Sequence, residues 1–363
     1  MPLDRSHSES SQIGSFWDQK LKELASRDPA IPLFWWDDPA TIRHINKLVC
    51  GRAIDGFHAG FHQRIGDMLR ASGVAAPKGI SVGSGSGMKE LWLLQTGAVA
   101  TMDCYELGPE LVEAGRRIAA DHGMENRLRM HLGDPFSNEL PADYDLVYWN
   151  NSLHHMKDTP AAMAWSRDRL RWGGLLALDD YVGPDRFQFS DELLRRASAA
   201  MALLPDRCLR KCDKPDEMVP RTLGRWSAET VAKEDPSEAC DSARILPALK
   251  SWFPDAEVIP TGGAVYFLGM CGLFGNFATE EDQRMLQAIL QIDHLLAERG
   301  ETPYAVGFGV KKRDGGNKAR KKFSTVWKHV FHCVEKTRKS FPYSRIQEPS
   351  AWSSVWRASA GVR

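Results

Sequence analysis

The chain has 363 residues, of which 43% are hydrophobic, and its acidic and basic side chains are equal in number. This length and composition predict one large core with additions, and they exclude a chain that is disordered over most of its length. It has no apolar run of about 18 residues and no secretory-type N-terminus, so we expect a soluble protein. The seven cysteines form no CxxC pair, which disfavours structural disulfides and a zinc knuckle.

The N-terminal region begins with a dozen residues rich in serine and charge, for which we expect no stable structure. Adjacent Trp35 and Trp36 follow, and such a pair is typical of a core anchor. His58 and His62 are one helical turn apart, a spacing that can hold a metal, but no third ligand lies near them in the sequence. We therefore expect a packed or solvated pair. Amphipathic patterns predict helices over residues 13–25, 41–49 and 58–72.

The most informative stretch is residues 78–87, KGISVGSGSG, in which a short apolar strand pattern runs into Gly83, Gly85 and Gly87 and then into a helical pattern. Glycines adopt positive φ and let the main chain approach a ligand closely, and the N-terminus of the following helix offers unpaired N–H groups. An isolated GxGxG can also be an ordinary turn, so the motif needs support from its context.

Further strand patterns supply that support. Residues 98–105 form an apolar run that ends on Glu106, 23 residues after Gly83 and close to the roughly 20-residue offset of a ribose-binding acid. A solvated helix-capping Glu106 is the alternative. Strand patterns at 127–132, 144–149 and 175–181 each alternate with helical patterns, which is typical of a parallel sheet with right-handed crossovers.

Over residues 56–178, and again over 256–310, this pattern resembles the class I S-adenosylmethionine-dependent methyltransferases. The resemblance implies S-adenosyl-L-methionine as cofactor. It also implies an α/β fold: a Rossmann-like, doubly wound, mostly parallel seven-stranded sheet with helices on both faces, an N-terminal helical cap and a helical insertion. The expected organisation is 1–55 for the N-terminal segment and cap, 56–182 for the cofactor-binding core, 183–252 for the insertion or lid, 253–310 for the last strands and helix, and 311–363 for a basic tail.

Carried over by position, the resemblance implies a cofactor-binding set: Gly83, Ser84, Gly85 and Gly87 beside the methionine part, Glu106 and Leu107 at the ribose, Asp134, Pro135 and Phe136 at the adenine, and Asn150 and Asn151 beside the transferable methyl group. It also makes Trp35 and Trp36 candidates for one wall of the site. Ser81 stands where the family has an acidic residue, so a catalytically silent cofactor-binding or scaffold protein is the alternative. A nicotinamide-dependent dehydrogenase is disfavoured because Met88 stands at its third fingerprint glycine.

Candidate catalytic groups follow the fourth and fifth strand patterns. Methyl transfer from a sulfonium depends mainly on positioning, and a base assists when the acceptor is an alcohol. His154 and His155 are the first candidates for that base, although each can instead cap a helix or hold the loop. Asp180 is the next candidate. A Mg²⁺ site that includes Asp179 is a minor alternative, and no metal is expected.

The insertion at 183–252 is the predicted lid, because segments at this edge of a parallel sheet lie where ligands bind. It is locally cationic, which suits a phosphorylated or carboxylated acceptor, although a solvated basic surface is equally compatible. The Trp-Trp-Asp-Asp-Pro entry, the run at 181–187, the segment at 234–239 and Gly262-Gly263 resemble bacterial methyltransferases associated with surface-polysaccharide assembly. The expected partner is therefore a small-molecule acceptor such as an activated sugar, methylated on oxygen.

Residues 311–363 carry 14 basic and three acidic side chains, a net charge of +11 that the rest of the chain balances. Apolar residues between Phe323 and Val334 recur at helical spacing. This basic amphipathic pattern allows a helix packed on the domain, a helix on an anionic membrane surface, or, least favoured, a nucleic-acid contact. The expected location is cytoplasmic, and in the second case peripheral to the inner face of the membrane.

Overall fold

The computed structural model describes residues 13–19, 22, 28, 30–137 and 139–313. One compact unit contains the described residues up to Lys311. The amphipathic stripe at 323–334 lies outside the described residues, as does most of the basic tail. Residues 13–19 are helical, as the pattern at 13–25 predicted for that part of it. Within the described residues, every helix is too short or too polar to cross a bilayer.

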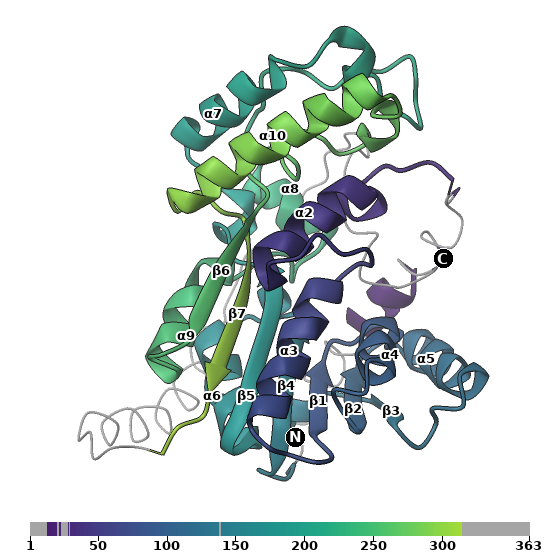
Figure 1. Cartoon of the computed structure of the whole chain (residues 1–363), viewed down its shortest axis with the longest axis vertical. Helices are drawn as coiled ribbons and strands as arrows, with labels where there is room; N and C mark the ends of the chain where they lie inside the picture. The colour runs from purple at the N-terminus through teal and green to yellow at the C-terminus, as the bar shows by residue number, and fades with distance from the viewer. Residues whose placement is uncertain (1–12, 20–21, 23–27, 29, 138, 314–363) are drawn as a thin grey trace, which may run out of the picture. The chain divides into compact units, whose positions relative to one another are not determined.

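The seven-stranded sheet has the order β3-β2-β1-β4-β5-β7-β6 (Figure 1). Strands β1 to β5 are parallel, and β7 runs antiparallel to both β5 and β6. This confirms the predicted mostly parallel, doubly wound sheet. The strands are β1 (Lys78–Val82), β2 (Thr101–Glu106), β3 (Leu128–Leu132), β4 (Tyr144–Asn150), β5 (Leu170–Tyr181), β6 (Glu257–Gly262) and β7 (Tyr304–Val310).

Helices cover both faces of the sheet, and each face has its own apolar cluster. Strand β4 shows why: Leu146 and Tyr148 enter one cluster, whereas Val147 and Trp149 enter the other, as the two-residue period of a doubly covered strand requires. The helices are α2 (Pro39–Cys50), α3 (Ala59–Ala71), α4 (Met88–Gln95), α5 (Pro109–Asp121), α6 (Thr159–Arg169), α7 (Asp191–Met201), α8 (Ala228–Glu234), α9 (Ile245–Trp252) and α10 (Glu280–Glu298).

Short 3₁₀ turns connect several of these elements, among them η1 (Trp35–Asp37) before α2 and η3 (Leu153–His155) after β4. The others are η2 (Pro135–Ser137), η4 (Asp185–Phe187), η5 (Asp206–Leu209), η6 (Ser242–Arg244) and η7 (Phe274–Asn276). Helices α3, α4 and α5 contribute to the first apolar cluster, and α6 and α9 to the second. Helix α9, at the end of the predicted insertion, therefore packs with the core.

Several element boundaries differ from the sequence prediction by a few residues, and two of them have a clear cause. Strand β5 begins at Leu170, several residues before the predicted strand, and runs through Gly173 and Gly174. These glycines stay in the strand because the N–H of Gly173 donates to Lys311 O (2.8 Å) and the N–H of Lys311 donates to Gly174 O (2.9 Å). Helix α3 begins at Ala59, one residue later than predicted, because His58 is in the left-handed region with φ 62°.

Candidate active site

The glycine-rich turn joins β1 to α4, and all three predicted glycines adopt the positive φ that the motif requires. The φ angles are 64° at Gly83, 59° at Gly85 and 72° at Gly87. At Gly83 a Cβ atom would also lie 2.9 Å from the Cβ of Ser152, closer than real Cβ contacts allow. The turn therefore needs glycine for its backbone conformation and, at Gly83, for its close approach to the segment after β4.

Glu106 ends β2 and holds the turn through its carboxylate. Its Oε2 accepts from the N–H of Gly85 (2.9 Å), and its Oε1 accepts from the N–H groups of Leu107 (2.7 Å) and Gly108 (3.0 Å). Burial raises the pKa of Glu106, and these three donors oppose that shift. The acidic side chain predicted at the ribose thus lies against the glycine turn, at the N-terminal end of α5.

A buried carboxylate lies next to Ser81, where the sequence lacks the expected acidic residue. Ser81 Oγ donates to Oε1 of buried Glu90 (2.7 Å), which lies in the first turn of α4. Next to it, the buried Lys89 donates from Nζ to Asn150 O (2.6 Å). Burial lowers the pKa of Lys89 and raises that of Glu90, while each side chain's charge opposes the shift of the other. In the sequence, the charged residues Lys89 and Glu90 shortly after the last glycine were the signal that could have indicated this carboxylate.

The polar atoms around the turn fit a polar ligand. Among the described residues, four of them are buried without a hydrogen-bond partner: Ser84 Oγ, Ser86 Oγ, Glu90 Oε2 and Ser152 Oγ. Buried polar atoms are usually paired, so this group indicates a missing partner. Hydroxyls and a carboxylate suit the amino and carboxylate groups and the ribose of S-adenosylmethionine.

At the predicted adenine end, Asp134 Oδ1 accepts from the N–H of Phe136 (2.9 Å) and so holds the Pro135 turn. The Phe136 ring is 39% exposed, and its centroid lies 4.9 Å from that of Trp165. The ring is therefore only partly covered by its neighbours. The adenine role of these three residues stays a prediction.

The N-terminal helical segment, residues 13–19, lies against the start of α5. Asp18 Oδ1 accepts from the N–H groups of Glu110 (3.0 Å) and Leu111 (3.1 Å), where α5 begins. A Cβ atom at Gly14 would lie only 2.2 Å from Leu107 O. The segment 13–19 therefore packs directly on the backbone that follows Glu106. Its Trp17 ring lies 5.0 Å from the ring of His155, so it also reaches the candidate bases.

Asp180 organises the segment after β4. Its Oδ2 accepts from the N–H groups of Ser152 (3.0 Å) and Leu153 (2.8 Å), and its Oδ1 binds Nδ1 of His154. Both carboxylate oxygens are therefore engaged, which favours a positioning role for Asp180 over that of a base. His155 Nδ1 lies 2.9 Å from Ser237 Oγ, which in turn donates to Asp235 Oδ1 (2.6 Å).

Asn150 and Asn151 end β4 beside the turn. Asn150 Nδ2 donates to the hydroxyl of Tyr148 (2.9 Å), and its Oδ1 accepts from Asn151 Nδ2 (3.0 Å). The N–H of Asn151 donates to Asp179 O (2.9 Å), and Asn151 has φ 51°. The structure thus brings the predicted methyl-side residues next to the end of β5.

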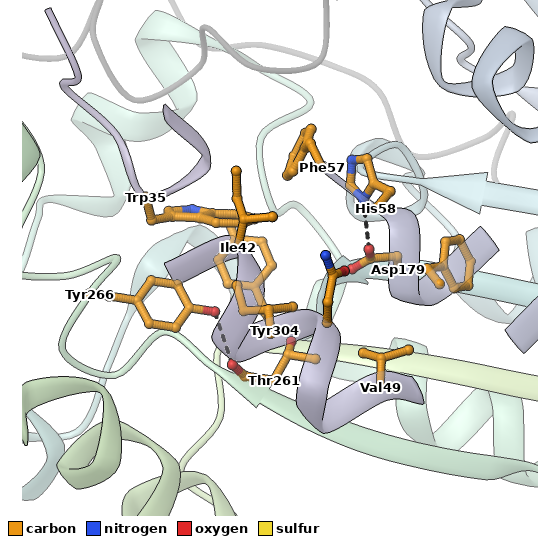
Figure 2. A pocket seen from close by; sticks show the side chains of 12 residues that line it. Trp35, Ile42, Val49, Phe57, His58, Asp179, Thr261, Tyr266 and Tyr304 are labelled. Atoms are coloured by element: carbon orange, nitrogen blue, oxygen red, sulfur yellow. Dashed lines mark hydrogen bonds and ion pairs between the residues drawn. The ribbon is translucent and has the colours of Figure 1, made fainter. Parts of the chain in front are cut away.

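A second histidine–aspartate pair was not predicted. His58 Nδ1 lies 2.9 Å from Asp179 Oδ2, and both residues line a pocket with Trp35 (Figure 2). Asn46 fixes the backbone that carries His58: its Nδ2 donates to Ile54 O (2.8 Å) and Gly56 O (2.9 Å), and its Oδ1 accepts from Gly60 N (2.8 Å). No local motif announces a pair separated by 121 positions.

Of the two sequence pairs singled out above, His58 with His62 and Trp35 with Trp36, only one residue of each lines the pocket. His62 Nε2 lies 2.9 Å from the Tyr148 hydroxyl, so His62 packs in the core while His58 faces the pocket. Trp35 lines the pocket, whereas the Trp36 ring stacks on Phe34 with centroids 4.5 Å apart. Only Trp35 of the two tryptophans is thus part of this wall.

The pocket itself is small and aromatic. The free space among its side chains is about 20 Å³, enough for one water molecule or one hydroxyl group. Two buried polar atoms of its lining, Trp35 Nε1 and His58 Nε2, lack a hydrogen-bond partner among the described residues. The remaining lining residues are Ile42, Ile45, Asn46, Val49, Phe57, Phe61, Thr261, Tyr266 and Tyr304.

The arginines of the predicted lid are engaged in structural contacts. Arg186 donates to the carbonyl oxygens of Asp235, Pro236 and Glu238. Arg207 pairs with Asp282 of α10, whereas Arg221 pairs with Leu204 and Asp206, and Arg225 with Phe189 and Asp191, within the lid itself. These contacts weaken the expectation that the lid's positive charge recognises a phosphorylated acceptor.

Residues 80–178 match a family model described as a methyltransferase domain. Comparison with curated protein sequences gave no match. Similar solved structures include the [4+2]-cyclase SpnF, at 16% identity and TM-score 0.44 over 84% of this chain and 97% of that chain. Geranyl diphosphate methyltransferase in complex with SAM is 11% identical, with TM-score 0.41 over 72% and 94%. The YcgJ protein from Bacillus subtilis is 15% identical, with TM-score 0.38 over 70% and 100%.

Proposed function

Residues 80–178 form a class I S-adenosylmethionine-dependent methyltransferase domain, and from this premise we propose that the enzyme methylates a hydroxyl group of a small acceptor, in particular a sugar. The observation that carries the proposal is the His58–Asp179 pair in the aromatic pocket. Asp179 pairs in register with Asn150, beside which the transferable methyl is expected. The pocket therefore adjoins the place where the reaction would occur.

The cofactor would be held by the glycine turn, Glu106 and Glu90, and when bound it supplies a methyl group on a positively charged sulfur. Ser81 donates a hydrogen bond to the Glu90 carboxylate, and the charge of Lys89 favours its ionised form. Residues 13–19 pack against the backbone at Leu107. Positioning of the acceptor behind the methyl group supplies much of the rate.

His58 has the surroundings of a general base. Burial lowers its pKa, although the hydrogen bond and charge of Asp179 oppose that shift, so the imidazole is neutral at neutral pH. A hydroxyl in the pocket would accept from Trp35 Nε1 and donate to His58 Nε2. The imidazolium formed by proton transfer would be stabilised by Asp179, which also fixes the tautomer.

The lining supports a ring-shaped, hydroxylated acceptor. Aromatic side chains such as Phe57, Tyr266 and Tyr304 offer apolar faces for the carbon–hydrogen face of a sugar, while His58 and Trp35 offer polar contacts. The cavity admits only one hydroxyl group as it stands, so the rest of the acceptor must lie outside it or displace a lining side chain.

The test is mass spectrometry of free and nucleotide-activated sugars incubated with the enzyme and isotopically labelled S-adenosylmethionine. We expect a labelled O-methyl product and a loss of kcat of about 10²-fold or more in His58→Gln, with cofactor affinity retained. His122→Gln, on an exposed helix end, is the matched control. A labelled N- or C-methyl product, or full turnover by His58→Gln, would contradict this assignment.

For the basic tail we propose peripheral contact of a cytoplasmic enzyme with an anionic membrane. The support is its net charge of +11 and its apolar spacing. Deletion of residues 314–363 should abolish sedimentation with anionic vesicles and leave cofactor binding intact. Failure of the intact protein to sediment with them at low salt would exclude the contact.

A further inference from the structure

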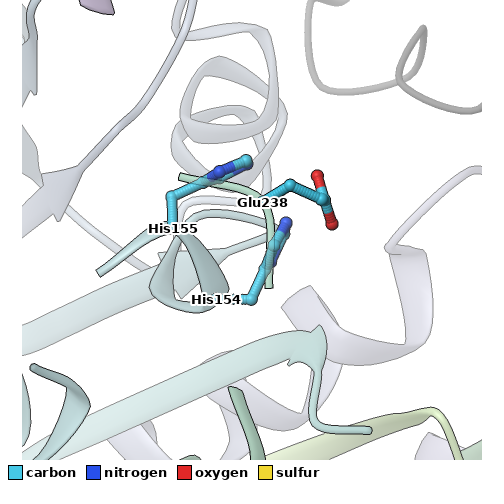
Figure 3. Close-up of side chains that lie close together, drawn as sticks. All are labelled: His154, His155 and Glu238. Carbon is cyan, nitrogen blue, oxygen red and sulfur yellow. The ribbon is translucent and has the colours of Figure 1, made fainter. Parts of the chain in front are cut away.

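We propose that His154, His155 and Glu238 form a binding site for a divalent transition metal ion, with Zn²⁺ as the preferred ion. One ligand atom from each residue lies within 4.8 Å of the other two. Figure 3 shows the three side chains turned toward one another, with the two histidines on η3 and Glu238 on the facing loop.

The donor set suits this class of ion. Two imidazoles and one carboxylate are a ligand set of catalytic zinc sites, which keep the fourth position open. Imidazole nitrogens select zinc and its first-row neighbours over Mg²⁺ and Ca²⁺, which prefer oxygen. Donor atoms bound to one tetrahedral Zn²⁺ are about 3.3 Å apart, given bond lengths of about 2.0 Å. Small side-chain rotations would therefore close the present cluster around an ion.

The groups behind the histidines orient them for binding. His154 Nδ1 contacts Asp180, and His155 Nδ1 contacts Ser237 Oγ, so Nε2 is the nitrogen through which each ring would bind the ion. Carboxylate and hydroxyl partners on the second nitrogen are typical of zinc-bound histidines, because they fix the tautomer and raise the basicity of the ligand. Asp180 is itself held by two backbone N–H groups, so this support is rigid.

Glu238 provides the independent observation. It is only 1% exposed, and its Oε2 has no hydrogen-bond partner among the described residues. A buried carboxylate is costly unless it is paired or coordinates a metal. Arg186, the nearby cation, directs its guanidinium to the carbonyl oxygens of Asp235, Pro236 and Glu238. Arg186 thereby holds the loop that carries Glu238 in place.

Aromatic side chains lie between the proposed site and the acceptor pocket. The His154 ring lies 6.2 Å from Tyr181, and Tyr181 lies 5.7 Å from Tyr304, which lines the pocket. A Zn²⁺ ion bound here would join η3 to the loop that carries Glu238. Binding of the metal itself requires neither cofactor nor acceptor.

The test uses the full chain without an affinity tag, treated with a chelator and titrated with ZnCl₂ by calorimetry. We expect one equivalent of Zn²⁺, and with Co²⁺ the visible absorption of a four-coordinate complex. Glu238→Gln keeps the shape of the side chain and should weaken Zn²⁺ binding by about 10²-fold or more. Glu298→Gln, an exposed acid on α10, is the control for charge removal.

His155→Gln gives a second variant in case Glu238→Gln does not fold, as checked by thermal unfolding. Absence of stoichiometric Zn²⁺ in the wild type would overturn the site, as would unchanged affinity in a folded ligand variant. Because the titration contains no S-adenosylmethionine and no acceptor, its outcome is separate from that of the methyl-transfer assay.

Discussion

Replacement of Glu106 by Gln tests whether this carboxylate builds the cofactor site. The charged side chain accepts three backbone hydrogen bonds, one from Gly85 in the glycine turn and two from Leu107 and Gly108. Gln has the same shape but only one acceptor oxygen. In either amide orientation its NH₂ group faces at least one backbone N–H that has lost its partner.

The expected magnitude follows from these bonds. One hydrogen bond to a charged acceptor contributes about 1.5–3 kcal/mol, which corresponds to an affinity change of about 10- to 150-fold. Loss of the Gly85 bond frees the turn that must contact the cofactor, and loss of the carboxylate removes the predicted ribose partner. Glu106→Ala loses all three bonds and should also lower the melting temperature.

The assay is calorimetric titration with S-adenosylmethionine, paired with thermal unfolding. Glu110→Gln is the matched control, because Glu110 is four residues away and, among the described residues, its side chain forms an exposed ion pair with Lys22 (2.9 Å). It should bind the cofactor like the wild type. If Glu106→Gln and Glu106→Ala are both folded and bind within about twofold of wild type, the cofactor does not depend on Glu106 and the reasoning is wrong.

Two further predictions concern the turn and acid stability. Gly83→Ala should lose more stability than Gly97→Ala in urea unfolding. Both residues have positive φ, at which an alanine costs about 1–2 kcal/mol, but only at Gly83 would the new Cβ also meet a neighbouring Cβ. Equal losses would show that the Ser152 contact is unimportant. Burial lowers the pKa of His44 to about 4, so its contribution to stability is present above the unfolded value of about 6.5 and is lost as pH falls toward 4. His44→Gln should therefore lose less stability than wild type between pH 7 and pH 4.5 in urea titrations, and parallel losses would contradict this.

The sheet and the glycine turn were predictable because their signals are local. Apolar runs and the glycines at 83, 85 and 87 lie within single stretches of chain, and strand alternation then determines the topology. The spacing from Gly83 to Glu106 can likewise be read directly along the sequence. These are the parts in which a few neighbouring residues decide the backbone conformation.

The acceptor side was not predictable in the same way. His58 meets Asp179 across 121 positions, and His155 meets Ser237 across 82. Such contacts depend on how α3 and the loop after α8 pack above the sheet, and no spacing rule describes that packing. Glu90 could have been predicted from the sequence, because it lies in the first turn of the helix that follows the glycines and so contacts Ser81 at the end of β1.

Strand β5 ends with two consecutive carboxylates that serve opposite sides of the sheet. Asp179 turns to His58, and Asp180 turns to His154, because neighbouring side chains of a strand point in opposite directions. A single inserted or deleted residue in β5 would exchange the two aspartates and disable both histidines together. The antiparallel pairing with β7 resists such a slip. Strands β5 and β7 therefore keep the His58–Asp179 pair and the His154–Asp180 pair in register with each other.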